Sequence, residues 1–187
     1  IIETDRLILR RLTDEDYGEI FGKLSDAEIM NMLYIRSLTE LELERKKQQK
    51  GYSTFNKRML TFQILNKHSL INIGWCGYHT WYIEHNRAEI GYGLIETERD
   101  KGYMSEALKV ILNYGFEKMK LNRIEAFVGP DNISSNRLVE KFNFQKEGIL
   151  REHYYNNGKL EDSIVYGLLK SDTNFDHQNT SKNENKQ

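Results

Sequence analysis

The chain has 187 residues, a length that fits one domain with a core large enough to need no disulfides or structural metals. Its 27 Lys and Arg residues nearly balance 28 Asp and Glu residues, which argues against nucleic acid or an anionic membrane as the main partner. The chain lacks the apolar run of about 18 residues that a spanning helix needs, and its single Cys76 has no partner for an internal disulfide. We therefore expect a cytoplasmic protein without a membrane span.

The first half of the chain carries both strand and helix signals. Alternation of apolar and charged residues predicts a strand over 6–12. Thr13 followed by acidic residues predicts a capped helix that runs to about Leu24, and a second, very polar helix is expected over 38–50. Three strands are then expected, the first two as a hairpin with a polar turn: 61–65, 71–81 and 88–95.

The second half is predicted to hold two helices and three strands. Helices are expected over 102–118 and 132–142, on either side of a strand over 123–128. The last strands, near 148–155 and 164–169, are joined through Asn156-Asn157-Gly158, because Asn-Gly favours a tight hairpin turn.

The order β-α-α-β-β-β-α-β-α-β-β predicts an α/β fold of the α+β kind, with a mixed, mostly antiparallel sheet flanked by helices. We expect one domain over 1–170. The polar tail over 171–187 is expected to be disordered, because it has too little apolar surface to offset the entropy cost of ordering.

The segment from Ala88 to Ala107 has the pattern of an anion site. A strand runs through a short turn into a helix that starts near Gly102. Free backbone N–H groups and the helix dipole favour an anion there, and Gly102 lets the backbone approach a phosphate closely. Arg99 and Lys101 are placed to add charged hydrogen bonds. Neither GxGxxG nor GxxxxGK[ST] is present, which argues against dinucleotide and P-loop sites.

Arg99-x-x-Gly102-x-Met104 resembles the R/Q-x-x-G-x-G/A pyrophosphate loop of the GNAT superfamily of N-acetyltransferases. The chain is more closely similar to the RimJ/RimL-like branch, over about residues 3–170. The matching segments are, in order, TDRLILRRLTDED, AEIGYGL, RDKGYMSEAL, LNRIEAFV, N-x-x-S-N with EKFNF, and YxNGKxxD with a later Tyr. Two positions depart from the pattern. Met104 stands where the loop usually has Gly or Ala, and Asn143 replaces a turn glycine but tolerates the same left-handed conformation.

The resemblance implies acetyl-CoA as co-substrate. Backbone N–H groups near Leu94 and Ile95 would contact the pantetheine or the carbonyl oxygen. The other cofactor-binding positions that the resemblance implies are Arg99, Lys101, Gly102, Tyr103, Met104, Ser105, Asn132, Asn136 and Lys141.

Glu89 is the first candidate for the general base, since it matches the strand-borne glutamate of GNAT histone acetyltransferases. Strand alternation puts Glu89 on one side with Gly91, Gly93 and Ile95, where the glycines leave room for a ligand or another backbone. The strand from Glu89 to Ile95 spans about 20 Å, comparable to an extended pantetheine arm. The alternative is an ordinary strand carboxylate paired with Arg87 or a lysine.

The general acid that protonates the leaving thiolate is less defined. The helix tyrosine that many GNAT enzymes use is replaced by Val139. Ser135 matches the serine of N-x-x-S-N, a proposed acid in the RimL-like branch, with capping or cofactor binding as the alternative. Glu152 and Tyr154 are reserve candidates.

The predicted reaction is transfer of acetyl to a primary amine by direct attack, with general-base assistance and without a metal. The acceptor is a protein N-terminus or an amine-bearing small molecule, bound near residues 17–34, the following helix and the terminal hairpin. A non-catalytic acyl-CoA-binding sensor or interaction module is the alternative. The five histidines lack metal-ligand spacing, and a homodimer is left open.

Overall fold

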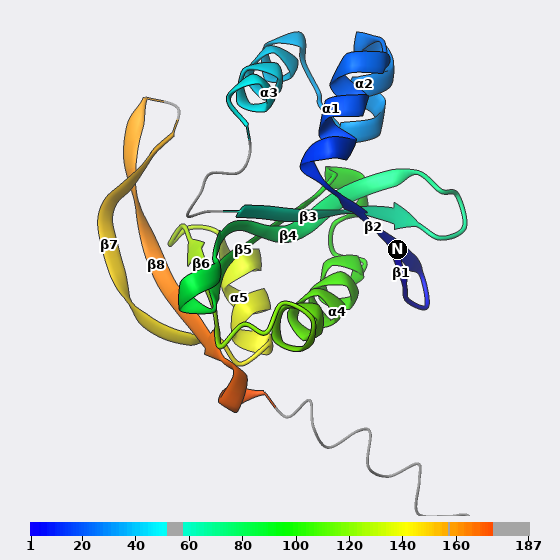
Figure 1. Cartoon of the computed structure of the whole chain (residues 1–187). Coiled ribbons are helices and arrows are strands. Elements are labelled where there is room, and N and C mark those ends of the chain that lie inside the picture. Colours follow the sequence, from blue (N-terminus) through cyan, green and yellow to red (C-terminus); the bar gives the residue numbers. More distant parts are fainter. Residues whose placement is uncertain (52–57, 157, 174–187) are drawn as a thin grey trace, which may run out of the picture. The chain divides into compact units, whose positions relative to one another are not determined.

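The computed structural model describes residues 1–51, 58–156 and 158–173 (Figure 1). The chain forms two compact units, one over residues 1–111 and one that begins at Leu112.

The first unit contains five strands that pair in chain order, each antiparallel to its neighbour. They are β1 (Ile2–Glu3), β2 (Leu7–Leu12), β3 (Arg58–Asn66), β4 (Asn72–Tyr82) and β5 (Arg87–Leu94). Leu9 of β2 lies opposite Ile64 of β3, and both are fully buried. Because alternate strand residues point to the same face, such pairs build a continuous apolar layer.

Three helices connect β2 to β3: α1 (Asp14–Lys23), α2 (Asp26–Leu33) and α3 (Leu38–Lys50). Thr13, Ser25 and Ser37 cap their first turns through side-chain oxygens. The three helices share a buried cluster with the end of β2: Leu12, Ile20, Phe21, Ile29, Ile35 and Leu41. In Figure 1 they lie on one side of the first unit's strands, and the start of α4 (Tyr103–Glu117) lies on the other.

The second unit holds the end of α4 and strands β6 (Arg123–Val128), β8 (Lys159–Leu169) and β7 (Gln145–Asn156), paired antiparallel in that spatial order. Helix α5 (Ile133–Lys141) is tied to β8 because the Tyr166 hydroxyl donates to Asn136 Oδ1 at 3.0 Å or Glu140 Oε1 at 3.1 Å. Short 3-10 turns occur at Ile83–His85, Glu96–Glu98 and Lys170–Asp172.

The predicted fold class is confirmed, and the predicted strands and helices are found with ends shifted by a few residues. Strand β1 and helix α2 were not predicted. The predicted Asn157 turn position and the tail from residue 174 lie outside the described residues, and the single domain over 1–170 stays a prediction. Within the part of the chain that the structure describes, no helix is both long and apolar enough to cross a membrane.

Candidate functional site

The loop between β5 and α4 makes a left-handed turn directly before the helix begins. Asp100 and Gly102 adopt left-handed conformations, with φ of 59° and 80°. The first α-helical bond runs from Glu106 N to Gly102 O at 3.1 Å. In helix geometry the N–H groups of Tyr103 and Met104 have no acceptor within the helix, and they lie at its positive end. Glycine adopts the φ of Gly102 without strain, and the role of Gly102 in binding a cofactor stays a prediction.

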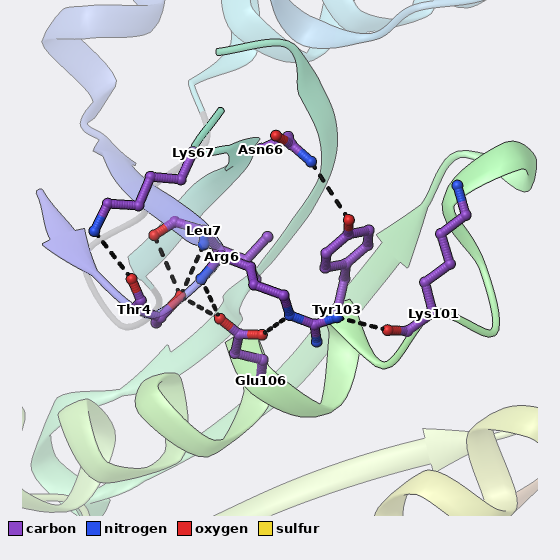
Figure 2. A network of polar contacts seen from close by, with 8 residues as sticks. All are labelled: Thr4, Arg6, Leu7, Asn66, Lys67, Lys101, Tyr103 and Glu106. Atoms are coloured by element: carbon purple, nitrogen blue, oxygen red, sulfur yellow. Dashed lines mark hydrogen bonds and ion pairs between the residues drawn. The ribbon is translucent and has the colours of Figure 1, made fainter. Parts of the chain in front are cut away.

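A network of polar contacts joins the N-terminal segment to the first turn of α4 (Figure 2). Glu106 Oε1 accepts from Thr4 Oγ1 at 2.6 Å and from the Arg6 backbone N–H at 2.8 Å. Glu106 Oε2 accepts from Arg6 Nε at 2.7 Å. Partial burial alone would raise the pKa of Glu106, but the hydrogen bonds from Thr4 and Arg6 outweigh it and hold that pKa below its usual value.

The guanidinium of Arg6 also reaches the loop itself. Its Nη1 donates to the carbonyl oxygen of Lys101 at 3.0 Å, and it lies 4.6 Å from the ring centre of Tyr103. A Cβ placed on Gly102 would lie 3.4 Å from Arg6 Nη2. Figure 2 shows Arg6 between Glu106, Lys101 and Tyr103. Sequence reasoning did not find this third cation beside the predicted phosphate loop.

The other predicted loop residues are placed as follows. Lys101 Nζ pairs with Glu98 at 3.1 Å, and Arg99 Nε donates to the Leu94 carbonyl at 3.4 Å. Both basic side chains are exposed, whereas Tyr103, Met104 and Ser105 are half-buried.

The prediction for Ile95 needs a correction. Its N–H already donates to the Ile73 carbonyl at 3.0 Å. Gly74 and Leu94 are therefore a non-hydrogen-bonded pair of the antiparallel ladder, so the N–H of Leu94 points away from β4. The role of the Leu94 N–H as a donor to the cofactor stays a prediction.

Glu89 lies in β5 with its side chain 14% exposed, and its Oε1 is 3.3 Å from Nε2 of His79. This contact is to a histidine of β4, a partner that the sequence prediction did not include. The space beside Gly91 and Gly93, expected to hold a ligand or another backbone, is occupied by two side chains of β4. A Cβ on Gly91 would lie 2.6 Å from His79 Cδ2, and one on Gly93 would lie 3.2 Å from Trp75 Nε1. These two side chains cover the glycines.

A cavity of about 830 Å³ opens in the first unit beside His79 and Trp75. Its wall is formed by the ends of β4 and β5, the segment after α2, and α3. Gln63 of β3 and Asn72 of β4 both donate to the Met32 carbonyl, at 2.5 and 2.8 Å, which fixes the end of α2 against the strands. The predicted acceptor region over 17–34 and the following helix contributes to this wall.

The remaining predicted residues lie in the second unit. Asn132 Oδ1 accepts from the Ser135 N–H at 3.1 Å, so Asn132 is the N-cap of α5. The Asn136 amide donates to the Gly129 carbonyl at 3.1 Å, and its oxygen faces the Tyr166 hydroxyl. Lys141 is exposed at the last turn of α5. Asn143 has a φ of 64°, which confirms the left-handed turn expected there.

Strands, helices and a helix-start loop in this order define an acyltransferase-like α/β fold, and the comparisons with known proteins agree. The acetyltransferase (GNAT) domain family matches residues 6–145. An uncharacterized N-acetyltransferase, YoaA of Bacillus subtilis, is 38% identical over 171 residues, which are 91% of this chain and 97% of that protein. The chain therefore belongs to the GNAT acetyltransferase family.

Two further proteins are similar over most of their length. The crystal structure of a GNAT-family acetyltransferase from Bacillus anthracis has a TM-score of 0.63 and 27% identity, and the match covers 91% of this chain and 98% of that one. The [ribosomal protein uS5]-alanine N-acetyltransferase of Escherichia coli is 23% identical over 188 residues, covering 91% of each chain. The protein is accordingly an acetyltransferase enzyme with the N-acetyltransferase activity of its family.

Proposed function

We propose that the chain transfers an acetyl group from acetyl-CoA to a primary amine, and that the β5–α4 loop holds the diphosphate of the donor. The observation that supports this most is the start of α4, where Gly102 at φ 80° lies next to the guanidinium of Arg6. Donors from a helix start and a nearby cation are what a diphosphate requires. Arg99 and Lys101 are exposed on the same loop.

The residues present suit the phosphate end of acetyl-CoA. Among the residues that the structure describes, only Arg6 Nη2 lies within 4 Å of a Cβ placed on Gly102, which leaves room for a ligand beside this backbone. Tyr103, Met104 and Ser105 would supply backbone N–H groups. Leu94 would offer its N–H along the pantetheine.

Glu89 supplies the proton acceptor in this proposal, and Ser135 is the proposed donor to the leaving thiolate. A carboxylate that is 14% exposed and held at 3.3 Å from an imidazole is fixed in place, which general-base catalysis needs. Asn132, Asn136 and Lys141 remain proposed cofactor contacts. The side-chain oxygen of Asn132 already caps α5. Asn132 would therefore help cofactor binding by orienting the start of this helix.

The acceptor is proposed to be a protein N-terminus, as the RimJ/RimL-like motifs suggest, or a small amine. The cavity beside His79 has aromatic side chains, among them Tyr17, Tyr34 and Trp75, together with charges of both signs from α3. A wall of this kind can stack an apolar stem and hold an ammonium group. Cytoplasmic location and a homodimer stay predictions.

The experiment is an acceptor screen on the full chain. Acetyl-CoA is mixed with a peptide bearing a free N-terminus, spermidine, an aminoglycoside and an amino-acid amide, and the products are identified by mass while thiol release is followed. The proposal predicts N-acetylation of at least one acceptor, with one thiol released per product. A folded chain that binds acetyl-CoA but acetylates none of these amines would favour the sensor alternative.

A further inference from the structure

His79 and Glu89 meet beside an irregularity in β4. The register runs from Tyr78 opposite Ile90 directly to Thr80 opposite Glu89, so His79 is an extra residue in β4. The register before the bulge, continued by one residue, sets His79 opposite Glu89 on the same face of the two strands. Nε2 of His79 lies 3.3 Å from Oε1 of Glu89.

The imidazole is also held by the shape of β5. A Cβ on Gly91 would be 2.6 Å from Cδ2 and 3.0 Å from Nε2 of His79. Any residue other than glycine would push the ring away, since such separations do not occur between real side chains. Nδ1 of the ring lies 3.3 Å from Thr80 Oγ1, so both ring nitrogens have a polar neighbour.

The two members of the pair differ in access to the cavity. His79 lines the cavity, and its side chain is 36% exposed, against 14% for Glu89. The cavity's charged side chains are Arg36, Glu40, Glu44, Lys47 and Lys50. Glu44 pairs with Lys47, and Glu40 accepts from the Arg36 backbone N–H at 2.8 Å. Glu89 of β5 is the carboxylate that contacts the imidazole.

We propose that His79 is the catalytic residue that takes the proton from the acceptor amine, and that Glu89 is the positioning residue that holds its ring. The inference rests on the proposed acetyl transfer and reassigns its general base from Glu89 to His79. Oε1 of Glu89 is placed to accept from Nε2–H, and in that tautomer Nδ1, which lies 3.3 Å from Thr80 Oγ1, carries the lone pair that takes the incoming proton. The carboxylate then stabilises the imidazolium that forms.

The ammonium nitrogen gives one proton to Nδ1 of His79, and its freed lone pair forms the N–C bond at the thioester carbon. The C–S bond breaks, the second proton of that nitrogen ends on the thiolate, and His79 returns its proton to solvent. Partial burial lowers the pKa of His79, so the imidazole is neutral and able to accept at neutral pH.

The test compares His79→Gln, Glu89→Gln and a matched control, His68→Gln, which makes the same change at an exposed turn residue. Turnover is measured against pH with one acceptor, whose own titration is common to all variants. We expect His79→Gln to lower kcat about 100-fold or more, with acetyl-CoA affinity unchanged within about twofold. The fall of kcat on the acidic side of the pH profile should also disappear in this variant. Glu89→Gln is expected to lower kcat less and to keep the acidic fall of kcat, which should occur at a lower pH than in the wild type.

A readout that does not need turnover is the NMR titration of the His79 ring. Glu89→Gln should lower the pKa of His79, because the carboxylate favours the imidazolium. An unchanged His79 titration in Glu89→Gln would overturn the pairing. A near-normal kcat in His79→Gln would overturn His79 as the base while leaving acetyl transfer intact. The same conclusion would follow if the acidic fall of kcat disappeared in Glu89→Gln but not in His79→Gln. A wild-type chain inactive on every amine would instead remove the proposed function, and this inference with it.

Discussion

Replacing Arg6 with Ala should loosen the β5–α4 loop and weaken acetyl-CoA binding. Three contacts of the side chain are lost: the ion pair with Glu106, the hydrogen bond to the Lys101 carbonyl and the contact with the Tyr103 ring. Arg6 is 48% exposed, so the ion pair contributes only about 0.5–1 kcal/mol. The hydrogen bond adds about 1 kcal/mol and the ring contact about 0.5–1 kcal/mol. We expect a loss of about 2–3 kcal/mol in unfolding free energy.

Only the contacts to Lys101 and Tyr103 reach the loop, so they set the effect on binding. Their loss of about 1.5–2 kcal/mol corresponds to a rise in Kd of about 10- to 30-fold, measured by calorimetry with acetyl-CoA at a temperature where the variant is folded. Arg11→Ala is the matched control, because it removes the same charge from an exposed position of β2. Equal Kd values for Arg6→Ala and the wild type would refute the idea that Arg6 holds the loop for binding. If Arg11→Ala weakened binding as much as Arg6→Ala, the loss of one positive charge would explain both effects.

Three further perturbations address other parts of the site. Gly91→Ala should displace the His79 ring and lower kcat about 10-fold or more, with acetyl-CoA affinity retained in calorimetry, because the added Cβ would lie 2.6 Å from the ring. Burial raises the pKa of the Cys76 thiol, so iodoacetamide should label it only after unfolding, and rapid labelling of the native chain would show that β4 opens. The pKa of Glu106 is lower in the folded chain than in the unfolded chain. Ionised Glu106 therefore stabilises the fold at a pH above its unfolded-state pKa, and this contribution is lost as the pH falls through its folded-state pKa. The gap in Tm between the wild type and Glu106→Gln should therefore narrow on acidification, and a constant gap would exclude this linkage.

Local patterns allowed most of the fold to be predicted, because strand alternation and helix caps act over a few residues. Thr13 and Asn132 cap α1 and α5 as expected, and Asn143 adopts the expected left-handed turn. Helix α2 was missed although Ser25 and Glu28 form a capping box, a signal that is present in the sequence. Strand β1 has two residues, too few for any periodicity.

The site was less predictable, because its contacts join distant parts of the chain. Arg6 contacts Glu106, which lies 100 positions later in the chain, and the sequence around Arg6 does not indicate that partner. His79 meets Glu89 because the pairing of β4 with β5 sets the two residues side by side. Alternation within one strand places a residue on one face or the other, and it does not give the register between two strands. The glycines of β5 were recognised as a source of space, but which side chains cover them depends on the register between β4 and β5.

The placement of the donor's diphosphate at Gly102 is tested most directly by calorimetric titration of acetyl-CoA into three forms of the full chain. Gly102→Asp and Gly102→Asn have nearly the same shape and the same demand for positive φ at this position, so they differ mainly by one negative charge. We expect saturable binding to the wild type, slightly weaker binding to Gly102→Asn, and a Kd at least about tenfold higher for Gly102→Asp than for Gly102→Asn. Equal Kd values for the two variants, or no saturable heat with the folded wild type, would contradict the proposed donor site.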